Sequence, residues 1–205
     1  MRILITGGSG FIGAALGARL REARHEIVTL GRDTSADFQW NPINGQIDLK
    51  ALDGVEAVIH LAGENVGQGR WSVAKKRRIL ESREVGTRLL CEAADKGKPK
   101  VIVTASGVGF YGDCGDEVLD ESSPPGNDFL AEVCQRWEAA CEPAVAAGIR
   151  VVNLRLGIVL SPMGGALKEM LLPFRLGVGG RLSSGKQWMS WITLADVIRV
   201  IERAL

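Results

Sequence analysis

Three glycines near the start of the chain have the spacing of turns that hold a phosphate group. Gly7, Gly10 and Gly13 follow a short apolar run at residues 3–5 and open a segment whose apolar residues recur every four positions, which predicts a strand, a turn and a helix. The first glycine permits the sharp turn, the second lets a pyrophosphate approach the backbone, and the third lets the helix pack on the sheet. Unpaired amide groups and the dipole at the helix start would then hold the anion. A glycine triplet alone is equally typical of a flexible turn, so the flanking strand and helix are what favour a dinucleotide site.

The end of the second expected strand, at residues 25–30, bears on which dinucleotide would bind. Sites that prefer NAD usually have a carboxylate here for the ribose 2′-hydroxyl, whereas a nearby arginine accommodates the 2′-phosphate of NADP. Gly31 stands at the expected carboxylate position and Arg32 follows it. We therefore predict NADP(H) as the cofactor. In the alternative interpretation Arg32 is an ordinary surface residue and Asp33 binds the ribose.

A continuous apolar strand is expected over residues 55–62. Ligands of an open parallel sheet bind beyond the carboxyl ends of its strands, so Leu61, Ala62 and Gly63 would lie along the dinucleotide. His60 falls within the strand and is interpreted as a packed histidine rather than a catalytic base.

A long helix is expected from residue 71 to about residue 95, and one face of it carries Arg83 among apolar residues. A charge on an apolar face needs a partner. Because this helix would cover the sheet near the cofactor end, we predict that Arg83 reaches a phosphate or ribose of the dinucleotide. A salt bridge to a carboxylate at the edge of the core is the competing interpretation. The basic run at residues 75–78 is expected to coat the solvated face of the same helix.

Ser106 and Tyr111 are the first residues along the chain that could act on a substrate. They lie at the end of a strand expected over residues 100–106 and just after it. Tyr111 could donate a proton to a substrate hydroxyl or carbonyl group, and Ser106 could position that group. Both could instead be structural, because a buried tyrosine usually bonds the backbone and a serine at a strand end often caps a turn.

The elements that must position these residues alternate between strands and helices. This order predicts an α/β fold with a Rossmann-type, doubly wound parallel sheet. Residues 1–160 are predicted to form the dinucleotide-binding domain, and residues 161–205 a small, incomplete C-terminal substrate lobe. The other expected elements are a connection with one short helix at 34–54, a lid loop at 113–128, a helix at 129–147, a strand at 149–156, a helix at 166–176 that Pro173 bends or splits, a ligand-contacting loop at 177–188 and a helix at 194–205.

Composition narrows the class of protein. The 205 residues are 46% hydrophobic, enough for one sizeable core, and a net charge of +1 with scattered basic residues predicts no nucleic-acid partner. No apolar run approaches membrane-spanning length and the chain begins directly in a strand, so a cytoplasmic protein without a membrane segment is expected. Neither a metal site nor a disulfide framework is indicated by the spacing of Cys91, Cys114, Cys134, Cys141, His25 and His60.

Six motifs follow one another along the whole chain: Thr6-Gly7-Gly8-Ser9-Gly10-Phe11-Ile12-Gly13, His60-Leu61-Ala62-Gly63, Gly86-Thr87-Arg88-Leu89-Leu90, Phe110-Tyr111-Gly112, Arg155-Leu156-Gly157 and Trp191-Ile192-Thr193-Leu194-Ala195-Asp196. In this order they resemble the extended short-chain dehydrogenase/reductase superfamily, of the nucleotide-sugar epimerase and dehydratase type. A closer resemblance is to a subgroup known only as epimerase family proteins, some of them described as cell-division-inhibitor-like. It is carried by Leu61-Ala62-Gly63-Glu64-Asn65, Arg70-Trp71, Glu81-Ser82-Arg83, Leu171-Leu172-Pro173-Phe174-Arg175-Leu176-Gly177 and Gly179-Gly180.

The resemblance implies a Rossmann-type NADP(H) binder. It implies a small-molecule substrate, such as a sugar nucleotide or another carbonyl or hydroxyl compound. It also implies cofactor contacts by Gly7, Gly10, Phe11, Ile12, Gly13, Arg32, Leu61, Ala62 and Arg83.

The sequence departs from the superfamily at the residues that carry catalysis. Superfamily members use a Tyr-x-x-x-Lys pair in the helix after the lid loop, in which the lysine lowers the pKa of the tyrosine and orients the nicotinamide ribose. Here Leu130 and Cys134 stand at those two positions. The superfamily's catalytic serine corresponds to Gly107, one residue after Ser106, and Arg83 replaces the usual asparagine.

Two functions are consistent with these observations. An NADP(H)-dependent oxidoreductase or epimerase-like enzyme would use Tyr111 and Ser106 at its substrate. Alternatively, a non-catalytic NADP(H)-sensing or regulatory protein, linked to cell division, would keep the cofactor site without the proton relay.

The resemblance also bears on assembly and on the C-terminal lobe. Superfamily relatives pair through helices like those at 71–95 and 129–147, which implies a homodimer unless those faces belong to the core. Their substrate lobes include residues beyond a helix like the last one here, so a lobe truncated at Leu205 is expected.

Overall fold

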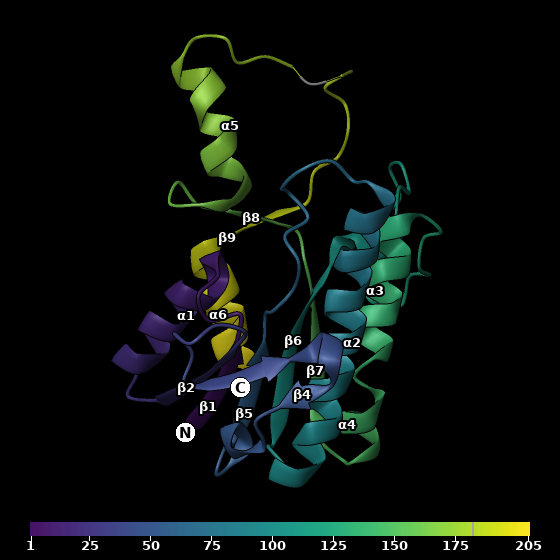
Figure 1. Cartoon of the computed structure of the whole chain (residues 1–205). Helices are drawn as coiled ribbons and strands as arrows, with labels where there is room; N and C mark the ends of the chain where they lie inside the picture. Colours follow the sequence, from purple (N-terminus) through teal and green to yellow (C-terminus); the bar gives the residue numbers. More distant parts are fainter. Residues whose placement is uncertain (182) are drawn as a thin grey trace.

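A single mostly parallel sheet organises the fold. The computed structural model describes residues 1–181 and 183–205; Leu182, in the loop predicted at 177–188, lies outside the described residues. Within that described part, seven strands pair in the order β4-β3-β2-β1-β5-β6-β7 (Figure 1), all parallel except β3 with β4. The predicted Rossmann-type α/β fold is confirmed. The strands are β1 (Arg2–Thr6), β2 (Glu26–Gly31), β3 (Phe38–Asn41), β4 (Gln46–Ile47), β5 (Ala57–His60), β6 (Val101–Gly107) and β7 (Arg150–Leu156).

Helices cover both faces of the sheet (Figure 1), as a doubly wound fold requires. Alternate residues of β1 enter two separate cores, Ile3 and Ile5 on the α1 side and Leu4 on the α2 side. This follows because successive side chains of a strand point to opposite faces. The helices are α1 (Phe11–Glu22) and α6 (Leu194–Ala204) on one face, and α2 (Val73–Gly97), α3 (Phe129–Ala139) and α4 (Glu142–Ala146) on the other.

A buried histidine ties β1, β5 and α2 together. His60 is fully buried, with its Nδ1 2.6 Å from the Thr6 hydroxyl and its Nε2 2.9 Å from the Thr87 hydroxyl. Burial, with a smaller contribution from the Arg83 cation, lowers the pKa of His60 to about 4. The ring is therefore neutral near pH 7 and has the surroundings of the packed histidine that the sequence indicates.

The segment at 34–54 differs from the expected connection with one short helix. It contains β3, β4 and two 3-10 helices, η1 (Pro42–Asn44) and η2 (Leu49–Leu52). The reason is Trp40, whose buried ring lies edge-on to His60 and close to Gly86 of α2. Burial of this one large side chain outweighs the polar, turn-rich composition around it.

Two helices also differ from the sequence-based expectation. The helix expected at 129–147 is interrupted after Ala139, and α4 begins at Glu142 with Pro143 in its first turn, where the missing amide costs no helical hydrogen bond. The helix expected to bend or split at Pro173 is not split. It runs as α5 (Gly165–Arg175), with the proline in its last turn.

The C-terminal residues lie in two places. β8 (Ile158–Leu160) and β9 (Trp191–Thr193) form a parallel pair, and α5 lies beside this pair, away from the seven-stranded sheet (Figure 1). Helix α6, which falls within the predicted lobe at 161–205, returns to the sheet, where Val197 and Ile201 are fully buried in the same core as Leu16 of α1.

We expect acid to destabilise the fold through His60. Its pKa is lower in the folded chain than in the unfolded chain, so the unfolded chain binds the extra proton between about pH 6.5 and pH 4. The contribution of the neutral ring is complete above pH 6.5, and as pH falls to 4 it declines by roughly 3 kcal/mol. Urea unfolding across this range should show a smaller pH dependence for His60→Gln. His25→Gln, which changes the other histidine of the chain, should keep the slope; an unchanged slope in His60→Gln would contradict the assignment.

Candidate functional site

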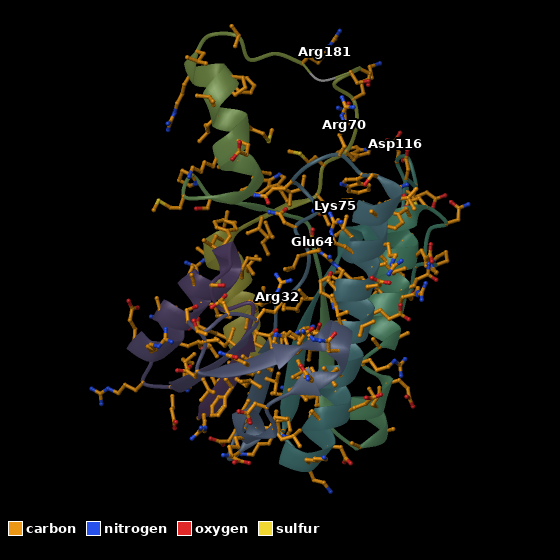
Figure 2. All side chains as sticks on the ribbon, viewed as in Figure 1. Arg32, Glu64, Arg70, Lys75, Asp116 and Arg181 are labelled. Atoms are coloured by element: carbon orange, nitrogen blue, oxygen red, sulfur yellow. The ribbon has the colours of Figure 1, made fainter. Side chains whose placement is uncertain are left out.

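A cavity of about 480 Å³ opens at the carboxyl ends of β1, β2 and β5. This is the edge of a doubly wound sheet at which ligands bind. Figure 2 labels Arg32 and Glu64, two of the lining residues, in the middle of the molecule. Of the residues predicted to contact a cofactor, Gly7, Gly10, Arg32, Leu61, Ala62 and Gly63 line the cavity, whereas Phe11, Ile12, Gly13 and Arg83 lie outside its lining.

The glycine turn is packed so tightly that side chains are excluded. Gly7 has φ +71°, and a Cβ there would lie 2.8 Å from the carbonyl group of Leu61. A Cβ at Gly13 would overlap the carbonyl oxygen of Gly7. The amide of Gly10 donates a 3.0 Å hydrogen bond to that same oxygen. The residues therefore have the shape that a phosphate-binding turn needs.

The first turn of α1 leaves amide groups open. Ala14 donates the first backbone bond, to Gly10, at 2.9 Å, so the amides of Phe11, Ile12 and Gly13 precede the helical ladder. Gly10 caps the helix without a side-chain hydrogen bond, and the first turn contains no acidic residue. The positive end of the helix is thus available to an anion. The side chain of Phe11 has a separate role, because its ring contacts Gly164 and Gly165.

The end of β2 has no room for a carboxylate at position 31. A Cβ at Gly31 would lie 2.8 Å from the Cβ of Ala36. The Asp33 carboxylate accepts hydrogen bonds from the hydroxyl and the amide of Ser35, and these bonds lower its pKa. Arg32 is exposed and forms no hydrogen bond or ion pair with any described residue. Arg32 is therefore the group at this end of the cavity that is open to an anion.

Arg83 is held by main-chain oxygens. Its Nη1 donates to the carbonyls of Glu64 at 3.0 Å and Ile79 at 3.2 Å, and its guanidinium carbon lies 4.8 Å from the centroid of the Trp137 ring. Burial lowers the pKa of Arg83. Across the described chain, no carboxylate forms the salt bridge of the competing interpretation. Arg83 instead supports the segment that follows β5.

Ser106 and Tyr111 lie outside the cavity and share one ion pair. The Ser106 hydroxyl donates to Glu138 Oε1 at 2.6 Å, and the Tyr111 hydroxyl accepts from Arg155 Nη1 at 2.9 Å. Arg155 and Glu138 pair at 2.8 Å, and both line a second cavity, of about 560 Å³, together with Tyr111. The polar groups of Ser106 and Tyr111 are thus engaged within the protein. Their catalytic role stays a prediction.

The two loops predicted to act as a lid and as a ligand contact meet each other. The indole nitrogen of Trp188 donates a 2.6 Å hydrogen bond to Asp116 Oδ1. Neither the loop at 113–128 nor the described part of the loop at 177–188 lines the first cavity. Figure 2 shows Asp116 and Arg181 near the far end of the molecule from the sheet.

Sequence reasoning missed an ion pair beside the cavity. Lys75 is buried and its ammonium lies 2.7 Å from Oε1 of Glu64, which lines the cavity. The expectation that the basic run at 75–78 coats a solvated face is therefore wrong for Lys75. The signal was available in the helical spacing, because Lys75 lies four residues before the buried Ile79 and so shares its face.

Comparison with known proteins identifies the family. Residues 3–205 match the NAD dependent epimerase/dehydratase family. The chain belongs to this family. Among relatives of this epimerase/dehydratase chain, an epimerase family protein of Mycobacterium bovis is 43% identical over 206 residues, which are 99% of this chain and 68% of that protein. The human epimerase family protein SDR39U1 is 36% identical over 211 residues, covering all of this chain and 70% of the human protein.

Solved structures of family members have the same fold. The structure of human SDR39U1 (isoform 2) with NADPH has a TM-score of 0.88 and 35% identity, and the match covers all of this chain and 70% of the human one. A nucleoside-diphosphate sugar epimerase from Corynebacterium glutamicum has a TM-score of 0.86 and 38% identity, and the match covers all of this chain but 43% of that one. The present chain thus spans only part of the length of its relatives.

Two features are absent from the described residues. No helix among them has both the length and the apolar content that crossing a bilayer requires. No group of histidine, cysteine, aspartate and glutamate side chains within residues 1–181 and 183–205 could hold a metal ion.

Substitution of Gly13 by alanine should destabilise the protein by about 1–3 kcal/mol. The new methyl group would overlap the Gly7 carbonyl oxygen, so the glycine turn and α1 would have to move apart. Gly17→Ala is the matched control on the same helix. Its Cβ would meet only the flexible end of Arg21, so higher helix propensity should make it neutral or up to about 1 kcal/mol stabilising. Chemical unfolding of both variants checks this, and equal stability of the two would contradict it.

Proposed function

We propose that the cavity binds NADP(H) and that the protein is an NADP(H)-dependent oxidoreductase or epimerase-like enzyme. The observation that carries the proposal is a turn with no room for a side chain at Gly7 or Gly13, at a helix start without a side-chain cap, with Arg32 open to an anion in the same cavity. The NADPH in the structure of human SDR39U1 supports the choice of cofactor.

The residues predicted to contact the cofactor have separate roles in this proposal. The glycine turn and the first amides of α1 would hold the pyrophosphate, and Arg32 would bind the 2′-phosphate. Leu61, Ala62 and Gly63 would pass along the dinucleotide. Arg83 would not contact the dinucleotide but would position the segment after β5, because it donates a hydrogen bond to the Glu64 carbonyl.

Bound NADPH would supply a hydride, and the chain would have to bind and protonate the substrate. Tyr111 is proposed as the proton donor and Ser106 as the positioning group. We propose a sugar nucleotide or another small carbonyl or hydroxyl compound as substrate, which the name of the C. glutamicum relative supports. A cytoplasmic location and a homodimer remain predictions from the sequence.

An NADP(H) sensor without chemistry is the second candidate. It is favoured by the engagement of Ser106 and Tyr111 with Glu138 and Arg155, and by Leu130 and Cys134 at the positions of the superfamily's proton relay. A sensor would bind NADPH tightly without consuming it.

Removal of the Arg32 side chain should weaken NADPH binding about 10- to 100-fold and leave NADH binding within about twofold, since a charge-assisted bond to phosphate contributes roughly 1.5–3 kcal/mol. Isothermal titration of Arg32→Ala with both nucleotides measures this. Arg24→Ala, another exposed arginine that lies outside the cavity lining, is the control and should bind both nucleotides normally. Equal losses for NADPH and NADH would assign the 2′-phosphate to another group.

Consumption of NADPH by the full chain, followed at 340 nm with a mixture of carbonyl metabolites and sugar nucleotides, should be detectable and should fall about 100-fold in Tyr111→Phe. Phe replaces the hydroxyl alone, so NADPH affinity should not change. An epimerase returns the hydride and leaves the cofactor unchanged overall, so tight binding with neither NADPH consumption nor conversion of the sugar nucleotides in the unsubstituted chain would favour the sensor instead.

A further inference from the structure

Glu64 is held by more interactions than a loop residue needs. Its amide donates to the Ser82 hydroxyl at 3.0 Å and its carbonyl accepts from Arg83 at 3.0 Å. Its Oε1 lies 2.7 Å from the Lys75 ammonium and 3.5 Å from Arg78 Nε. All four partners come from α2. Glu64, in the segment that follows β5, is therefore fixed by its amide, its carbonyl and its carboxylate at once.

The ion pair with Lys75 is costly to build. The ammonium is almost fully withdrawn from water, and a buried charge is strongly unfavourable unless a well-placed opposite charge compensates it. The hydrogen bond from Lys75, opposed in part by burial, lowers the pKa of Glu64, so the carboxylate is ionised at neutral pH. A fixed, ionised acceptor thus stands at the edge of the cavity.

The second carboxylate oxygen of Glu64 remains open. Oε2 accepts no hydrogen bond from any residue in the described part of the chain, and Glu64 is 25% exposed where it lines the cavity. β5 lies on the opposite side of β1 from β2, so Glu64 and Arg32 flank the glycine turn on two sides. A dinucleotide bound across that turn would place one ribose group near Glu64 or near Arg32.

We propose that Glu64 accepts a hydrogen bond from a ribose hydroxyl of the bound dinucleotide and that Lys75 is the positioning residue for this contact. The inference rests on the proposed NADP(H) site. A carboxylate is a poor neighbour for phosphate and a good acceptor for hydroxyl groups. The cations of Lys75 and Arg78 offset its charge, so an anionic cofactor can bind beside it.

Titration of Glu64→Gln with NADPH and with adenosine 2′,5′-bisphosphate tests the contact. Glutamine keeps the size of the side chain and one oxygen that can accept from Lys75, but it loses the negative charge. The Kd for NADPH should therefore rise at least fivefold. A loss for NADPH alone assigns the nicotinamide ribose, and an equal loss for the bisphosphate assigns the adenosine ribose. Unchanged binding of both probes overturns the inference, and so does tighter binding, which would mean that the carboxylate only repels the phosphates.

Glu84→Gln is the matched control. Glu84 lies on α2 and pairs with Arg136 at 2.7 Å, outside the cavity lining, so its loss should not change either Kd. Thermal unfolding of both variants checks that each is folded. If the unsubstituted chain binds neither probe, the proposed function itself fails; if it binds both and Glu64→Gln matches it, only the present inference fails.

The role of Lys75 is tested by pH. In Lys75→Met the carboxylate loses its ammonium partner and its pKa rises, so the ratio of the NADPH Kd to that of the unsubstituted chain should increase as pH falls from 7.5 toward about 5.5. A purely structural role would give a ratio that does not change with pH, and that result would remove Lys75 from the proposal.

Discussion

The main chain at Gly7 approaches the main chain at Leu61 so closely that a single added methyl group would separate them. This contact joins the end of β1 to the end of β5 and fixes where α1 begins, because Gly13 packs on the same turn from the other side. The direction of α1, the open amides at its start and the edge of the cavity all follow from it.

β5 links the fold to the cavity. Within the strand, His60 bonds the hydroxyls of β1 and α2 and stays neutral because it is buried. Shortly after the strand, every partner that the described residues provide for Glu64 comes from α2. One helix therefore supports both the interior of the sheet and the cavity wall, with neutral groups in the core and charged groups beside the cavity.

The parts that are continuous in sequence could be predicted, and those assembled from distant segments could not. The strand, glycine turn and helix at 2–22 are contiguous, so spacing alone located them. The Glu64–Lys75 pair depends on which face of α2 packs against the sheet. The hydroxyl of Tyr111 is bonded by Arg155, which lies 44 residues further along the chain. β3 was missed because its pairing with β2 is decided by the burial of Trp40, which local composition does not report.

Helix α5 stands apart from the sheet and has no buried residue, while α1 and α6 share a core. An eleven-residue helix in water is marginal on its own, since most helical stability in proteins comes from packing. Amide hydrogens of α5 are therefore expected to exchange with solvent through local opening that costs little free energy. Those of β1 and β5 are expected to exchange only on global unfolding. Backbone hydrogen bonds of very unequal lifetime are therefore expected within the same chain.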